Sequence, residues 1–95
     1  MKNKIVQADT EEGQKAGEVI VEIIENQLAD DNPPETKQTL KRLMKLGESR
    51  ENAIRYISTA LTVEIFGAFK HNEPFNHERY VKNLTALPNL PDGFE

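Results

Sequence analysis

The sequence predicts an all-α protein, a small bundle of three main helices and a shorter fourth in which the second and third helices form an antiparallel hairpin. Prolines and capping residues divide the chain into segments of helical length. Its 95 residues suit one domain, and we expect extended tails at residues 1–8 and 88–95. Apolar residues recur at helical spacing within four segments, which are residues 16–28, 34–46, 49–70 and 77–86.

The first helix is expected to begin at Asp9 or Thr10, because either side chain can accept a hydrogen bond from a free N–H of the first turn. The run VIVEII is also compatible with a strand, but the 3–4 spacing and the glutamate-rich opposite side favour a helix. Residues 30–34 end this helix, since a residue that precedes a proline avoids the α region. The apolar stripe consists of Ala16, Val19, Ile20, Ile23, Ile24 and Leu28.

The second and third helices are separated by a very short connection. Pro34 begins the second helix, where its missing N–H has no cost, and Gly47 ends it. Ser49 is a favoured N-cap residue for the third helix, so a hairpin is expected. The third helix is the longest, and we expect it to supply the core through Ala53, Ile54, Ile57, Ala60, Leu61, Ile65 and Ala68.

A fourth, shorter helix is expected over residues 77–86. Pro74 prevents the third helix from continuing, and Asn76 is a suitable N-cap. Its apolar side is formed by Tyr80, Val81, Leu84 and Leu87.

Two polar residues interrupt the apolar stripes. Glu64 falls among the core positions of the third helix, and Gln27 falls on the stripe of the first. A buried carboxylate must be paired, hydrogen-bonded, metal-bound or protonated, and a buried amide needs a specific partner. We therefore hypothesise a buried polar contact between Gln27 and Glu64, with a structural Glu64 satisfied by a neighbouring helix as the simpler reading.

Four side chains of the third helix lie off its core stripe and are candidates for an interface: Tyr56, Val63, Phe66 and Phe69. If exposed, they form an apolar patch that requires a partner. The alternative is that the fourth helix and the C-terminal tail cover them. An apolar fraction of 37% beside a charged fraction of 29% is low for a self-sufficient core, so a homodimer is expected.

Composition excludes several classes of protein. The chain has no cysteine, which excludes disulfides and zinc–thiolate sites and fits a reducing cytoplasm. The first residues lack a hydrophobic signal region, and no apolar run reaches the ~20 residues that span a bilayer. We expect a cytoplasmic protein that is not bound to a membrane.

Charge is unevenly distributed along the chain. Residues 9–31 hold eight acidic side chains and one lysine, whereas residues 37–55 hold six basic and two acidic ones. The acidic helix could face the basic hairpin within a subunit or across a dimer. The basic side chains Lys37, Lys41, Arg42 and Lys45 could also contact phosphates, although a net charge of −4 argues against a nucleic-acid binder.

An enzyme is the other alternative, and it would depend on a metal. Helical bundles build such sites from inward-facing glutamates and Glu-x-x-His pairs. The chain has no such pair, and the residues that could substitute are Glu22, Glu25, Glu64 and His71. No nucleotide-binding loop, nucleophile elbow or zinc-protease motif is present. We therefore predict no cofactor and favour a role without catalysis.

The strings ENQLADDNPPE, LKRLMKLGESRENAIRYISTAL, EIF and PFNHERYVKNLTALP resemble a small family of uncharacterised bacterial helical proteins. The resemblance covers roughly residues 16–88 and implies the same helix order. The family is a domain of unknown function, so no activity is implied. Some relatives have a zinc-binding C-terminal motif of the SEC-C type beside the domain, which this chain lacks. Relatives often have histidines on the first helix, where this chain reads GQKAGEVIVEII.

The resemblance singles out residues of three expected helices and the glycine that ends the second: Glu25, Asn26, Gln27, Gly47, Ala53, Ile54, Glu64 and Tyr80. Without the histidines of its relatives, the chain would lack any metal or proton role that they serve. We expect an uncharacterised helical protein that acts as a homodimer in protein–protein contact or as an accessory module.

Overall fold

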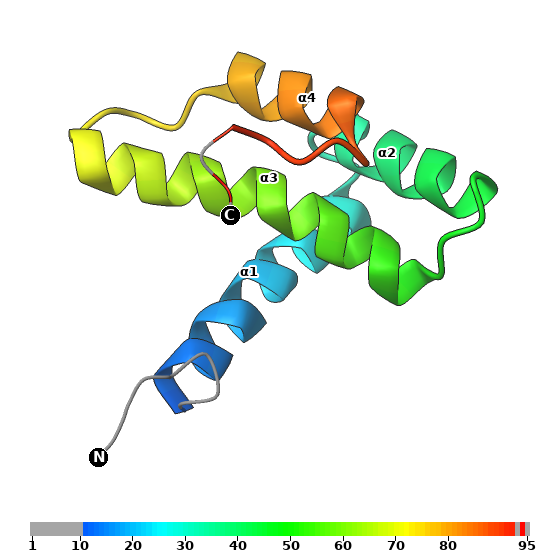
Figure 1. The fold of residues 1–95 in the computed structure, drawn as a ribbon, viewed down its shortest axis with the longest axis horizontal. Helices are drawn as coiled ribbons and strands as arrows, with labels where there is room; N and C mark the ends of the chain where they lie inside the picture. The colour runs from blue at the N-terminus through cyan, green and yellow to red at the C-terminus, as the bar shows by residue number, and fades with distance from the viewer. Residues whose placement is uncertain (1–10, 93, 95) are drawn as a thin grey trace.

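The computed structural model describes residues 11–92 and 94, with side chains from Ala16 onward. Within these residues the chain is folded into four helices that pack as a small bundle, so the all-α prediction is confirmed (Figure 1). The expected caps Asp9 and Thr10, and the tail at residues 1–8, lie outside the described residues. The helices are α1 (Glu11–Asp30), α2 (Pro34–Lys45), α3 (Arg50–His71) and α4 (His77–Ala86).

Helix α3 is the centre of the bundle and contacts each of the other three helices. Its buried face includes Ile57 and Leu61, which pack with Ile24 of α1 and Leu43 of α2. The predicted core stripe of α3 is mostly buried, but Ile65 and Ala68 near its C-terminal end are only half-buried. The bundle core therefore ends before α3 does.

Two of the helices begin at the predicted N-cap residues. The Ser49 side chain accepts a 3.0 Å hydrogen bond from the backbone N–H of Asn52, and the Asn76 side chain accepts a 2.9 Å bond from that of Arg79. Each bond satisfies one of the free N–H groups of a first turn. Helix α2 begins with Pro34, as predicted, and no side-chain cap is found there.

The first three helices end in the same way. A left-handed residue follows each helix within two positions, with φ of 51° at Asp31, 110° at Gly47, which comes after Leu46, and 54° at Asn72. In each case the backbone N–H of the left-handed residue and that of the next residue donate hydrogen bonds to carbonyls of the last helical turn. At the end of α2 these bonds run from Gly47 to Met44 and from Glu48 to Leu43. This pair of bonds is the Schellman motif, which satisfies two carbonyls that a helix end leaves free.

The remaining segments complete the bundle around α3. Helices α2 and α3 form the predicted hairpin, and α4 packs on both of them. After α4 the chain returns along α3, with Leu87 and Pro91 buried (Figure 1). Helix α1 crosses α3, and its N-terminal half projects beyond the other helices (Figure 1). No helix in the described part of the chain has both the length and the apolar character that crossing a bilayer requires.

Candidate protein interaction surface

Glu64 is fully buried, and three hydrogen bonds from the start of α4 satisfy its carboxylate. One oxygen accepts bonds from the backbone N–H of Asn76 at 3.0 Å and from Nη2 of Arg79 at 3.2 Å. The other accepts a bond from Nε of Arg79 at 2.5 Å. Because a buried charge is costly unless it is paired, this ion pair explains how the carboxylate is tolerated in the core. The bond to Glu64 also raises the pKa of Arg79.

Gln27 has different partners from Glu64. Its side-chain oxygen accepts a 2.7 Å bond from the hydroxyl of Thr36 and a 2.8 Å bond from the hydroxyl of Tyr80. One amide oxygen of α1 thus accepts hydrogen bonds from both α2 and α4. Burial raises the pKa of the Tyr80 hydroxyl, and its hydrogen bonds partly oppose that shift.

The hypothesis of a direct contact between Gln27 and Glu64 is therefore wrong. The hydrogen bonds of both side chains lead to α4, which binds Gln27 through Tyr80 and Glu64 through Arg79. The two polar positions predicted to interrupt the core do connect helices to one another, but each accepts its bond from a donor on α4 and neither contacts the other. Periodicity could not show this, because it places residues on a face without showing which helix packs there.

The alternative metal ligands are not brought together. Glu25 forms two 2.9 Å hydrogen bonds with the guanidinium of Arg50, which lower the pKa of that carboxyl. Glu64 is paired with Arg79, while Glu22 and His71 are exposed on different helices. Among the described residues, no cluster of three or more potential ligands could hold a metal ion. Glu25 and Glu64 thus form ion pairs, Glu22 lies exposed on α1, and the alternative ligand set is wrong.

The basic side of α2 is not wholly available to phosphates. Arg42 donates from Nη1 to the carbonyl of Leu87 at 2.8 Å and from Nη2 to that of Leu84 at 3.0 Å. A cation that satisfies the last carbonyls of α4 also suits the negative end of the helix dipole. Lys41 and Lys45 remain exposed. The bonds between Glu25 and Arg50 show that the acidic and basic regions do meet within one chain.

The other residues highlighted by the resemblance have structural roles or face solvent. Gly47 occupies the left-handed position at the end of α2, while Ala53 and Ile54 are buried in the core. Asn26 is exposed. These positions account for helix ends and packing and do not form a reactive site.

The four candidate interface residues divide into two pairs. Tyr56 is half-buried and lies beside Leu90 of the C-terminal segment, and Val63 is also half-buried. Phe66 and Phe69 are 60% and 83% exposed, near the open end of α3. The first pair is therefore partly buried, with Tyr56 packed against the core, and the second pair is exposed.

A groove between α1 and α3 borders Phe66, and we call it the α1–α3 groove. It has a volume of about 320 Å³ and is mostly apolar. On α1 it continues the face that buries Ile24, because Ile20 lies one turn before Ile24. The residues that line it are Ala16, Gly17, Ile20 and Val21 of α1, Arg55, Ser58, Thr59, Thr62 and Phe66 of α3, and Phe94.

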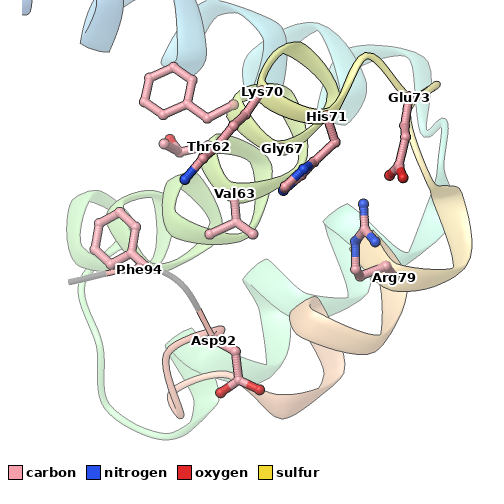
Figure 2. Close-up of a pocket in the computed structure, with 10 residues that line it drawn as sticks. Thr62, Val63, Gly67, Lys70, His71, Glu73, Arg79, Asp92 and Phe94 are labelled. Atoms are coloured by element: carbon pink, nitrogen blue, oxygen red, sulfur yellow. The ribbon is translucent and has the colours of Figure 1, made fainter.

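A second hollow, of about 590 Å³, lies on the other side of Phe66, between α3, the start of α4 and the C-terminal segment (Figure 2). Its apolar floor includes Val63 and Phe94, and Arg79 lies between His71 and Glu73 at its rim (Figure 2). Lysine and arginine are balanced there by the carboxylates of Glu73 and Asp92. This mixed charge favours neither a simple anion nor a cation.

Sequence patterns contained signals for two partners that the predictions missed. Thr36 lies four residues before Leu40 and seven before Leu43, on the buried face of α2. Arg79 lies in the first turn of α4, where the helix dipole disfavours a cation, so it needed a specific acidic partner.

The α1–α3 groove and the exposed Phe66 and Phe69 together form the candidate interaction surface. Comparisons with models of protein families, with curated proteins and with solved structures found no match to this chain.

Proposed function

We propose that this chain is a protein interaction module that acts as a homodimer, with the α1–α3 groove, Phe66 and Phe69 as its contact surface. The exposure of the two phenylalanines carries the proposal. Aromatic side chains dominate the energy of interfaces, and each buries ~150–250 Å² when covered. Phe66 borders the apolar groove and Phe69 lies one turn beyond it on α3, and an exposed apolar patch of this kind marks a binding site.

The projecting half of α1 supports a second copy as the partner. A helical segment of a few turns is marginal in water unless its apolar face is packed. In α1 this face is packed at Ile24 and Leu28 but open at Ala16, Gly17 and Val21. A second copy provides an equivalent helix that suits the groove, as in other complexes that seat an amphipathic helix between two others.

Sedimentation equilibrium tests the proposal. We expect the wild-type protein to have twice the chain mass of 10.8 kDa at micromolar concentration. Phe66→Ser/Phe69→Ser should raise the dissociation constant of the dimer at least about 100-fold, as expected for the loss of two interface aromatics. Because both side chains are exposed, the variant should keep its helical circular dichroism.

The matched control is Met44→Ser/Leu46→Ser, which removes two exposed apolar side chains from the end of α2. It should leave the dimer unchanged. A wild-type protein that stays monomeric up to millimolar concentration contradicts the homodimer, and equal effects of the two double variants contradict the assigned surface.

The other functions have less support. A nucleic-acid role would use Lys41 and Lys45, because Arg42 is bonded to α4. A metal-dependent enzyme has no ligand cluster among the described residues. Membership of the uncharacterised bacterial family and a cytoplasmic location are further parts of the proposal, based on the sequence.

A further inference from the structure

We infer that the second hollow, between α3 and the start of α4, binds a free amino acid that has an apolar side chain. Arg79 holds the carboxylate of this ligand, Glu73 holds its ammonium group, and its side chain lies against Val63 and Phe94. The inference does not depend on the homodimer, because the two charged residues that it uses do not line the α1–α3 groove.

The second hollow has the size and the apolar floor of a site for a small molecule. Its volume is about 590 Å³, and ligand pockets typically have volumes of about 300–1,000 Å³. Val63 and Phe94 are both half-buried, so each still has apolar surface that a ligand can cover. Such pockets combine apolar side chains with a few polar groups that orient the ligand.

The charges around the hollow are balanced, which favours a ligand that carries both signs. Among the described residues, two cations and two carboxylates line it: Lys70, Arg79, Glu73 and Asp92. A ligand with a single charge would meet groups of its own sign as well as of the opposite sign, and like charges in contact oppose binding. An amino acid is a zwitterion, so each of its charged groups can face a group of opposite sign.

Arg79 is fixed by a bond that leaves part of its guanidinium open. Its Nε and Nη2 donate to the buried carboxylate of Glu64, while no bond from its Nη1 to another described residue is found. A guanidinium that is already held in place loses little freedom when it binds a second carboxylate. His71 lies beside Arg79 at the rim and has a ring N–H that can donate to the same carboxylate (Figure 2).

Glu73 provides the opposite charge on the same rim. Its side chain is exposed and points toward Arg79 (Figure 2). The bond to Glu64 is the main cause of the raised pKa of Arg79, and the charge of Glu73 adds to it, so Glu73 and Arg79 lie near one another. No ion pair joins them in the described part of the chain. Because the carboxylate and the ammonium group of an amino acid are attached to one carbon atom, a single ligand can bind both residues.

Isothermal titration calorimetry of the full chain with L-phenylalanine tests the inference. We expect one ligand per chain and a dissociation constant below about 1 mM. Three further probes each lack one feature of phenylalanine: 3-phenylpropanoate lacks the ammonium group, 2-phenylethylamine lacks the carboxylate, and glycine lacks the side chain. Each of them should bind at least about tenfold more weakly than phenylalanine.

Glu73→Gln tests the contact assigned to the ammonium group. It should weaken the binding of phenylalanine at least about fivefold without weakening that of 3-phenylpropanoate, because only phenylalanine has an ammonium group. Glu73 is exposed, so the variant should keep its helical circular dichroism. Glu51→Gln, at an exposed carboxylate near the other end of α3, is the matched control and should leave the binding of both probes unchanged.

Three results would overturn the inference. The first is phenylalanine binding that does not saturate up to about 10 mM. The second is a probe with a single charge that binds as tightly as phenylalanine does. The third is a loss of phenylalanine binding that is equal in Glu73→Gln and Glu51→Gln. None of these results bears on the homodimer, which sedimentation equilibrium tests separately.

Discussion

At the scale of single residues, one amide oxygen connects three helices. Oε1 of Gln27 accepts bonds from Thr36 and Tyr80, so α1, α2 and α4 meet at one atom. The Tyr80 side chain is fully buried, with its ring against that of Phe75 at 5.5 Å between centroids. A buried hydroxyl that is bonded specifies how helices pack, because any other arrangement would leave it without a partner.

Tyr80 predicts a loss of stability at high pH. Its pKa is raised above 10.0 in the folded protein, so the unfolded chain releases the phenolic proton first. The stability that the protonated Tyr80 hydroxyl contributes is fully present below the unfolded-state pKa. It is lost as the pH rises from there through the folded-state pKa. Tyr80→Phe should reduce the free energy of unfolding by about 1 kcal/mol at neutral pH.

Urea unfolding at about pH 8 and about pH 11 measures this effect. Wild-type protein should lose more stability between the two pH values than Tyr80→Phe, since other groups titrate equally in both. Parallel losses in the two proteins would show that the Tyr80 proton is not linked to folding.

At the scale of helices, Glu64 connects the third helix with the start of the fourth. Its carboxylate pairs with Arg79 and accepts the backbone N–H of Asn76, at the end of α4 where the helix dipole favours a negative charge. Arg42 performs the complementary task at the other end of α4, where it satisfies the carbonyl of Leu84. Both ends of this short helix are thus held by oppositely charged side chains of its neighbours.

Substitutions of Glu64 should therefore follow a defined order. Glu64→Gln keeps an acceptor for the Asn76 N–H and should reduce the free energy of unfolding by about 1 kcal/mol. Glu64→Leu removes every acceptor and should reduce it by about 2–3 kcal/mol. Glu51→Gln, at an exposed carboxylate of the same helix, is the control and should change it by less than about 0.5 kcal/mol. Thermal and urea unfolding give these values, and a more stable Glu64→Leu protein would contradict a stabilising role for the pair.

The helices could be predicted from the sequence because their signals are local. Ser49, Asn76 and Gly47 each act within a few residues of their position, and the structure places them at the expected helix ends. The pairing of Gln27 with Tyr80 and of Glu64 with Arg79 could not be predicted, because the two residues of each pair are 53 and 15 positions apart. Their identity depends on how α4 returns to the bundle, which no periodic pattern contains.

The candidate surface could be predicted in part, because helical periodicity is also a local signal. Helical periodicity places Phe66 and Phe69 off the core stripe, and both are exposed. It also places Tyr56 and Val63 there, but both are half-buried. The C-terminal segment that lies beside Tyr56 has no helical periodicity to predict its path. An interface role for these residues stays a prediction.

At the scale of the whole molecule, α1 is unequally packed along its length. Its C-terminal half is bonded to α2, α3 and α4 through Gln27 and Glu25, while its N-terminal half projects and leaves apolar groups open. A homodimer would cover this half together with Phe66 and Phe69. We therefore predict that the amides of residues 16–22 gain protection from hydrogen exchange only when a second copy binds.

Hydrogen exchange measured as a function of protein concentration tests this claim most directly. Amides in residues 16–22 of α1 should exchange more slowly as the concentration rises through the dissociation constant, while those of Tyr80 and Leu84 in α4 should stay equally protected throughout. Exchange in residues 16–22 that does not change with concentration, while the protein itself becomes dimeric, would show that the two copies meet elsewhere and would contradict the assigned surface.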